Sequence, residues 1–206
     1  MIMLYVNNNG EIIENIDYTI KTGNRGYFYG DGVFESIRVL NGKPINLANH
    51  ISRMLEGAKK IKMRPPSFFN VSFFEERIIE LCKKSVITEG GKCRVSLDRS
   101  SGGNYQPDSN EVEFYIEVYP TEVNKYELNQ KGVELDIYLE HKKDKSSLSN
   151  FKTKNGLIYI MAAISAKEKG LDDYLITNYS GGILESTSSN LFVVSNGVLY
   201  TPGLEE

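Results

Sequence analysis

Hydrophobic and polar residues alternate in the first part of the chain as they do in half-buried strands. Residues 3–6 and 12–18 alternate on either side of an asparagine-rich turn, which indicates a hairpin. Residues 34–40 alternate again and meet Asn41 and Gly42, a pair typical of type I′ turns. We therefore expect antiparallel strands at the start of the chain.

Two amphipathic helices are expected before a second pair of strands. The first helix has a stripe of apolar residues at helical spacing: Ile51, Leu55, Ala58 and Ile61. The second helix covers residues 70–86. Residues 93–97 and 111–119 then predict paired strands, and their long glycine-rich connection at 98–107 is of the kind that often carries function.

The pattern changes after residue 119, and this change predicts two domains. Residues 120–131 are polar and mixed, which is typical of a linker. Beyond the linker we expect a strand at 132–140, a helix that ends near Gly170, and short strands at 174–177, 183–185, 190–194 and 198–200. The predicted fold class is α/β, with a small α/β domain over residues 1–119 and a second domain over 132–206.

Composition and charge narrow the classes of function. The chain has 206 residues, of which 40% are hydrophobic and 25% charged, which suits a globular protein with a sizeable core. A net charge of -3 gives no basic field for nucleic acid, and no apolar run approaches a membrane span.

The chain starts without the features of a signal peptide, and Cys82 and Cys93 form no CxxC pair, so we expect a cytoplasmic compartment. His50 and His141 lie in no ligand-spaced motif, so no metal site is expected.

The clearest chemical signal is a lysine followed further along by a carboxylate. Lys152 lies just before an apolar helical run, and Glu185 precedes four consecutive hydroxyl residues. A lysine amine can form a Schiff base with an aldehyde, and a carboxylate can partner a pyridinium nitrogen. These residue types are the set that pyridoxal phosphate needs.

Two arginines and a glycine-rich run are further candidates. Arg53 lies one helical turn before Gly57, where its side chain can reach across the gap toward a phosphate, although a solvated surface arginine is the alternative. Arg99 stands at the base of the long loop, where it can hold a substrate carboxylate or form a surface ion pair. Three glycines among aromatic residues at 26–32 indicate either a backbone that passes close to a ligand or a tight turn before a strand.

Taken together, these stretches resemble the fold type IV pyridoxal-phosphate enzymes. That family includes branched-chain aminotransferases, D-amino-acid aminotransferases and aminodeoxychorismate lyases. The matching stretches are 24–35, 50–54, 151–155, 185–192 and 199–202, in the same order across nearly the entire chain. Each stretch is weak evidence alone, and their order makes the signal strong.

The resemblance implies a role for each matching residue. Lys152 matches the Schiff-base lysine, because the family pattern has an asparagine three positions on, here Asn155. Lys154 is the competing candidate, and it has the wrong spacing. Arg53 matches the arginine that binds the cofactor phosphate, and Glu185 matches the carboxylate that faces the pyridine nitrogen.

The same resemblance also implies roles for residues whose match to the family pattern is less specific. Ser188 and Ser189 lie where the family lines the ring or phosphate of the cofactor with small or hydroxyl residues. Tyr29 and Phe34 match positions that face the substrate pocket, and the Arg99 loop is similar to that of the lyases. The family usually forms dimers, so a homodimer is expected.

The activity that the resemblance implies is transamination between an amino acid, branched-chain or D-, and a 2-keto acid, with pyridoxal 5′-phosphate as cofactor. The substrate cues disagree: residues 33–38 favour branched-chain enzymes, 98–105 the lyases, and 185–190 the D-amino-acid enzymes. The alternatives are therefore an aminodeoxychorismate lyase that forms p-aminobenzoate and pyruvate, or an inactive remnant. Family members continue beyond the position of Glu206, so we expect an incomplete pseudo-barrel in the large cofactor-binding domain.

Overall fold

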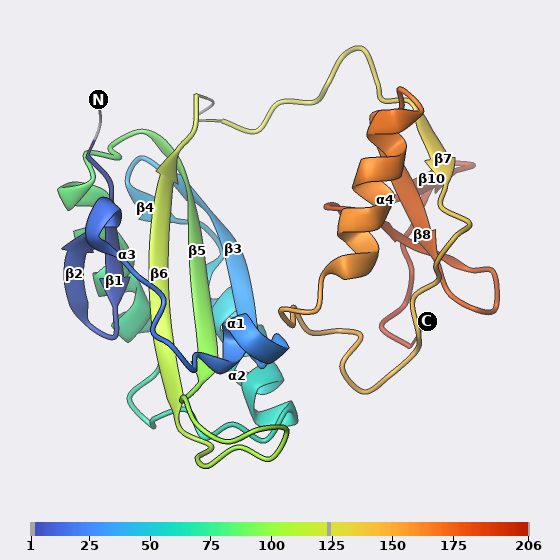
Figure 1. Cartoon of the computed structure of the whole chain (residues 1–206). Coiled ribbons are helices and arrows are strands. Elements are labelled where there is room, and N and C mark those ends of the chain that lie inside the picture. Colours follow the sequence, from blue (N-terminus) through green and yellow to red (C-terminus); the bar gives the residue numbers. More distant parts are fainter. Residues whose placement is uncertain (1–2, 123–124, 206) are drawn as a thin grey trace. The chain divides into compact units, whose positions relative to one another are not determined.

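The computed structural model describes residues 3–122 and 125–205. Residues 1–2, 123–124 and 206, which belong to the expected domains and linker, lie outside the described residues. The chain divides into two compact units (Figure 1). Unit 1 comprises Met1–Tyr126 and Phe151–Lys154, and unit 2 comprises Glu127–Asn150 and Asn155–Glu206.

Unit 1 is built on one antiparallel sheet with the strand order β2-β1-β6-β5-β3-β4. Its strands are β1 (Tyr5–Asn8), β2 (Glu11–Glu14), β3 (Gly32–Leu40), β4 (Lys43–Pro44), β5 (Gly90–Arg99) and β6 (Val112–Pro120). Its helices are the 3-10 turn η1 (Asn15–Asp17), α1 (Arg25–Tyr29), α2 (Leu47–Lys60) and α3 (Val71–Lys84). The expected hairpins and both expected helices are present, but the strand expected at 12–18 ends at Glu14, where η1 begins.

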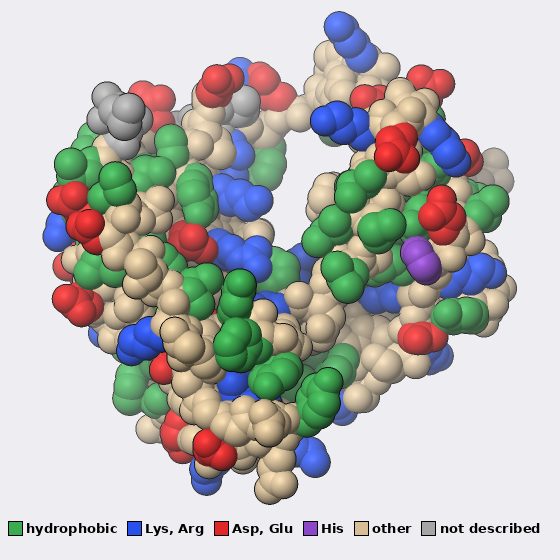
Figure 2. All heavy atoms as spheres, in the orientation of Figure 1, with side chains coloured by type: hydrophobic (Ala, Val, Ile, Leu, Met, Phe, Trp, Pro, Cys, Tyr) green, Lys and Arg blue, Asp and Glu red, His purple; other side chains and the backbone are tan. Residues whose placement is uncertain are grey.

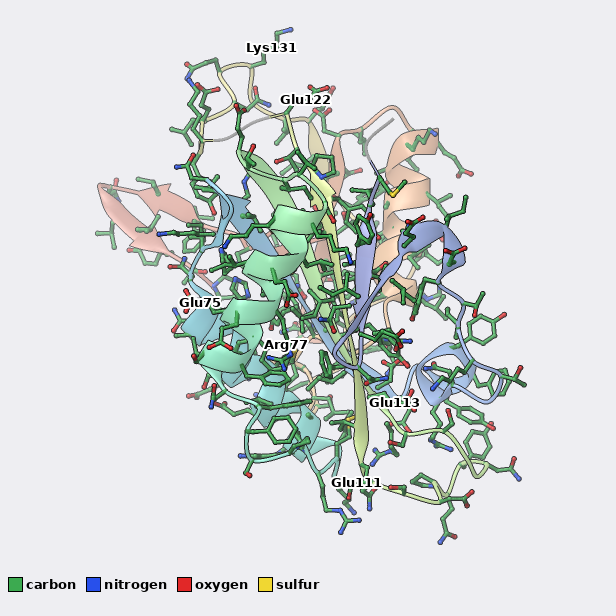
Figure 3. All side chains as sticks on the ribbon, turned by 90° about the vertical axis from the view of Figure 1, so that its left-hand side faces the viewer. Glu75, Arg77, Glu111, Glu113, Glu122 and Lys131 are labelled. Atoms are coloured by element: carbon green, nitrogen blue, oxygen red, sulfur yellow. The ribbon has the colours of Figure 1, made fainter. Side chains whose placement is uncertain are left out.

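One face of this sheet packs against α2 and α3 because the inward positions of each strand are apolar. Ile37 and Val39 of β3 are buried, and they lie in one core cluster with Ile51 of α2 and with Phe74 of α3. Figure 3 shows α3 lying along the sheet, with Arg77 labelled on it. The alternation of β3 also sends neighbouring side chains to opposite faces of the sheet.

The helices of unit 1 differ in how the residue before the first turn is arranged. The Asn70 side chain accepts a hydrogen bond of 2.9 Å from the Phe73 amide and caps α3. Asn46 precedes α2 in the left-handed conformation, with φ at 53°, and its side chain makes no capping bond. The short helix α1 was expected to be a loop; it forms because the Asn24 side chain caps it and Gly30 closes it at a φ of 64°.

Unit 2 has a three-stranded sheet in the order β7-β8-β9, a separate β10-β11 hairpin and one helix. Its elements are β7 (Leu135–Ile137), α4 (Leu157–Glu168), β8 (Asp173–Thr177), β9 (Ile183–Ser186), β10 (Val193–Ser195) and β11 (Val198–Tyr200). The strand expected at 132–140 is thus limited to three residues. The helix packs on β8 through Ala162 and Ala166, which lie in a cluster with Tyr174 and Ile176.

The other side of α4 is apolar and exposed. Leu157, Ile160 and Ile164 have exposed fractions of 76%, 54% and 49%, and Figure 2 shows hydrophobic side chains along this helix. A helix that is apolar all round is usually covered on all sides, so this surface is unusual for a solvent-facing helix. Among the described residues, no helix has the length and apolar character needed to cross a membrane.

Candidate functional site

The segment that carries the candidate lysine is tied to the start of β3 in unit 1. The Phe34 amide donates to the Lys152 carbonyl at 2.8 Å, and the Lys154 amide donates to the Gly32 carbonyl at 3.0 Å. Thr153 forms an antiparallel bridge with Val33 between these two bonds. Residues 151–154 therefore act as a short extra strand, and their side chains alternate about the edge of the sheet.

The two candidate lysines are two positions apart and therefore lie on the same side of this short strand, but their side chains have different partners. The Lys154 ammonium forms a 2.5 Å ion pair with the carboxylate of Asp98, whose side chain is 3% exposed. The Lys152 amine lies 5.7 Å from the centroid of the Phe34 ring, and no carboxylate among the described residues pairs with it. The structure therefore leaves the Lys152 amine accessible and commits the Lys154 amine to a buried partner.

The glycine-rich run makes room for the Asp98 carboxylate. A side-chain carbon at Gly32 would lie 2.5 Å from an Asp98 oxygen and 2.8 Å from the Leu97 carbonyl, and one at Gly26 would also overlap the carboxylate. The Asn24 side chain donates to the same carboxylate at 3.3 Å. The turn before β3 is present, with Gly30 closing α1, and the backbone at Gly26 and Gly32 also passes close to another group, the Asp98 side chain. A ligand at this run stays a prediction.

The predicted substrate residues Phe34 and Tyr29 lie in different surroundings. The Arg94 guanidinium stacks 3.7 Å from the Phe34 ring centroid, so two cationic side chains contact this ring. Tyr29, on α1, lies 5.6 Å from the Tyr105 ring. The structure thus brings Phe34 next to Lys152, whereas the contacts of the Tyr29 ring are with Arg25, Phe28 and Tyr105.

Arg53 is held by a buried carboxylate on the helix-covered side of β3. Two nitrogens of its guanidinium donate to Glu35 at 2.6 Å each, and His50 Nδ1 lies 2.7 Å from Glu35 Oε2. Glu35 is fully buried, whereas the Arg53 side chain is 40% exposed. Burial alone would raise the pKa of Glu35, but the hydrogen bonds with His50 and Arg53 hold it below its ordinary value. The Arg53 Nη1 group has no partner among the described residues, so one edge of the guanidinium is open to a ligand.

Arg99 is in a different position from the one that a substrate-binding role requires. Its side chain is 7% exposed. It donates to both Asp31 oxygens at 2.9 and 3.1 Å, to Asn110 at 2.5 Å, and to the carbonyls of Ile61 and Lys62 at 2.7 and 3.4 Å. These five bonds use all five N–H groups of a guanidinium. Arg99 as a substrate-carboxylate ligand stays a prediction that this geometry does not favour.

Glu185 lies on β9 in unit 2 with two donors on one oxygen. Lys143 Nζ lies 2.6 Å from Oε1, and the Tyr159 hydroxyl donates to the same atom at 2.8 Å. The predicted ligands Ser188 and Ser189 are exposed in the turn that follows β9, where their amides donate to the Ser186 hydroxyl at 3.5 and 3.1 Å.

Several polar residues around the candidate lysine and around Glu185 were missed from the sequence. Asp98 falls in the connection expected at 98–107, whereas the structure places it near the end of β5. Glu35 lies inside a predicted strand, and the apolar residues at the alternate positions 33, 37 and 39 were the available signal that it is buried. Lys143 belongs to a charge run at 142–145, a pattern that is typical of a solvated turn, yet its side chain is only 21% exposed. The pattern is misleading for Lys143, because its ion pair with the distant strand β9 leaves no local signal in the sequence.

A surface hollow of about 440 Å³ lies elsewhere in unit 2, between the end of α4 and the start of β8. Its lining includes Gly170 and Asp173 and none of the predicted site residues. We therefore do not place the site there. Within the described part of the chain, no group of three or more histidine, cysteine or acidic side chains is placed to hold a metal ion.

Comparison with known proteins gives consistent matches over the chain. The sequence profile described as Amino-transferase class IV matches residues 32–206. A putative branched-chain-amino-acid aminotransferase of Methanocaldococcus jannaschii is 25% identical over 201 residues, covering 94% of this chain and 66% of that protein. A D-alanine aminotransferase of Staphylococcus aureus is 26% identical over 204 residues, covering 94% of this chain and 67% of that protein. The chain thus spans about two thirds of the length of these relatives.

Solved structures match the fold. A branched-chain aminotransferase of Thermoproteus uzoniensis, determined with norvaline, has a TM-score of 0.86 at 23% identity and covers 98% of this chain and 69% of that one. An aminotransferase of Brucella abortus, bound to the cofactor PLP, has a TM-score of 0.81 at 19% identity, covering 97% and 71%. The expected mixed α/β fold and the family resemblance are confirmed.

Proposed function

The chain belongs to class IV of the aminotransferases, and from this premise we propose that it binds pyridoxal 5′-phosphate and transfers an amino group between an amino acid and a 2-keto acid. The observation that carries the proposal is the difference between two neighbouring lysines. Lys154 is committed to Asp98, whereas the Lys152 amine is unpaired beside Phe34. A lysine amine that is not held by a carboxylate is available to form a Schiff base with an aldehyde.

The residues present fit the groups of this cofactor. The open edge of Arg53 suits a phosphate, because a guanidinium binds phosphate oxygens through paired N–H donors. Glu185 has one oxygen, Oε2, without a donor among the described residues, which suits a protonated ring nitrogen. Lys152 supplies the amine, and Ser188 and Ser189 supply exposed hydroxyl groups.

The chemistry divides between the cofactor and the chain. When bound, pyridoxal phosphate supplies an electron-withdrawing ring that stabilises negative charge at the substrate α-carbon. The Lys152 amine would act as the base that takes the proton from the substrate α-carbon and as the acid that returns a proton. Glu185 would hold the ring nitrogen and favour its protonated form by placing a negative charge next to it. The Phe34 ring, whose centroid lies 5.7 Å from the Lys152 amine, would offer an apolar surface beside it.

Branched-chain amino acids and D-amino acids are the two substrate classes that we propose to test, since relatives of both kinds match the chain. We also propose a homodimer. The exposed apolar side of α4 supports association, because surfaces of this kind usually meet another surface.

Reduction with borohydride in the presence of pyridoxal phosphate, followed by peptide mapping, tests the proposal. We expect the label on Lys152. The Lys152→Ala variant should lose the label and the yellow colour, whereas Lys154→Met, the matched control, should keep both. A label on another lysine, or no label on the wild-type chain, would contradict the proposal.

Product analysis separates the alternative activities. An aminotransferase forms the keto acid only when a second keto acid accepts the amino group. A lyase would release pyruvate and p-aminobenzoate from aminodeoxychorismate without any acceptor, and an inactive remnant would give neither product. We expect acceptor-dependent turnover.

A further inference from the structure

The environment of Glu185 is built by three elements of unit 2 that are distant in sequence. Glu185 is paired with Ile176 of β8. Lys143 joins the same sheet, because it bridges to Asn178 in parallel and its amide donates to the Thr177 carbonyl at 2.9 Å. Tyr159 comes from the first turn of α4. Because Lys143 is joined to the sheet and Tyr159 lies on α4, the backbone fixes the positions of both donors relative to Glu185.

Both donors are directed at one oxygen of the carboxylate. The Lys143 ammonium is 2.6 Å from Oε1 and the Tyr159 hydroxyl is 2.8 Å from it. Oε2 has no partner among the residues that the structure describes. The Glu185 side chain is 28% exposed, so Oε2 remains accessible while Oε1 is saturated.

The opposite charges of Lys143 and Glu185 attract each other across the 2.6 Å contact. Burial would lower the pKa of Lys143, but its contacts with Glu185 and Tyr159 raise that pKa above the ordinary value of 10.5. Lys143 is therefore fully charged at neutral pH. The Lys143 cation thus holds Oε1 through a charge-assisted hydrogen bond.

We propose that Lys143 and Tyr159 are positioning residues that hold Glu185 by Oε1 and present Oε2 to a protonated aromatic nitrogen. This inference rests on the proposed function for the identity of the nitrogen, which belongs to the cofactor ring. Neither residue touches the reacting atoms: each acts through Glu185. Lys143 is thereby assigned a role distinct from that of Lys152, although both are lysines of the candidate site.

The first test follows Glu185 alone, in the full chain without cofactor. Carbon-13 labelling of glutamate carboxyl groups, with Glu185→Gln to identify the signal, reports the surroundings of the Glu185 carboxylate through its chemical shift. We expect Lys143→Met to move this signal toward those of exposed carboxylates, and Lys143→Arg to leave it close to that of the wild type. An unchanged signal in Lys143→Met, or an equal change in Lys143→Arg, would overturn the proposal. If Lys143→Met does not fold, Tyr159→Phe carries the test, with a smaller change of the signal expected.

The second test compares two probes, pyridoxal phosphate and its 1-deaza analogue, in which a C–H group replaces the ring nitrogen. The wild type should bind pyridoxal phosphate more tightly than the analogue, and Lys143→Met should lose most of this preference, on the order of tenfold. Affinity for the analogue itself should not change. An equal loss for both probes would show a merely structural role and overturn the inference. If the wild type binds neither probe, the proposed function fails, while the carboxyl signal of Glu185 still decides whether Lys143 positions it.

Discussion

Single side chains decide which of two adjacent lysines is available for chemistry. Lys152 and Lys154 differ little in sequence context, and both follow the polar segment that precedes α4. The difference arises because Asp98 is buried in a space left by two glycines, and a buried carboxylate needs a cation. Lys154 satisfies that need, and Lys152 is left free.

The Lys154–Asp98 pair should be important for stability. Lys154→Met leaves the buried carboxylate of Asp98 without its cation, so we expect the free energy of unfolding to fall by about 2 kcal/mol. Urea unfolding measures this loss. The double variant Lys154→Met, Asp98→Asn should recover part of it, because the uncompensated charge is gone. If the double variant is less stable than the wild type by the sum of the losses in Lys154→Met and Asp98→Asn measured singly, the pair is not coupled as described.

Glu35 should make stability depend on pH in the acid range. Its pKa in the folded protein is lowered from an ordinary value of 4.5, since the hydrogen bonds with His50 and Arg53 outweigh the effect of burial. A lowered pKa contributes stability above the unfolded pKa, and this contribution is lost as the pH falls through the folded pKa. Glu35→Gln should therefore destabilise the protein near neutral pH and have a progressively smaller effect below pH 4.5.

Urea unfolding over a series of pH values checks this expectation. Glu75→Gln, at an exposed carboxylate on α3 (Figure 3), is the matched control and should show little effect at any pH. A loss for Glu35→Gln that is the same at acid and neutral pH would mean that the charge of Glu35 does not stabilise the fold.

At the scale of elements, the two long helices of unit 1 begin in different ways. Asn70 caps α3 with its side chain, so Asn70→Ala should cost about 1 kcal/mol of unfolding free energy. Asn46 makes no such bond and has a φ of 53°, a conformation that glycine adopts without strain. Asn46→Gly should therefore leave stability unchanged or raise it slightly. Thermal unfolding of both variants tests the contrast, and equal losses at the two sites would contradict it.

The elements also show where sequence patterns and structure diverge. The hairpin turn at Asn41 and Gly42 and the α3 cap follow from local preferences, and both are present. The helix α1 was missed because five residues rich in aromatic side chains show no helical stripe. Its formation depends on Asn24, which also contacts the distant Asp98.

The two units of the molecule differ in how much of their apolar surface is buried. Unit 1 has a large buried core, whereas unit 2 exposes much of α4 and of the β10-β11 hairpin. The expected domain boundary at 120–131 stays a prediction. The short return of Phe151–Lys154 to unit 1 had no signal in the sequence, and it is the feature that places Lys152 beside β3.

The exposed side of α4 should make the folded chain self-associate and bind hydrophobic dyes. Ile160→Lys and Ile164→Lys each remove an exposed apolar side chain and add a charge, so both should lower dye binding and association measured by sedimentation. Ile16→Lys is the control, since Ile16 is exposed elsewhere, in unit 1. The expectation is wrong if the α4 variants behave like this control.

Sequence by itself determined the features of this protein that are local. Apolar spacing predicted the main strands and helices, the order of short motifs indicated the family, and the spacing from Lys152 to Asn155 singled out the candidate lysine. Only the tertiary structure decided which charges meet. Lys143 pairs with Glu185 across 42 residues of sequence, and Arg99 is enclosed by groups that leave it no free donor. The physical reason is that periodicity and capping depend on neighbouring residues, whereas ion pairs depend on where the folded backbone brings distant side chains.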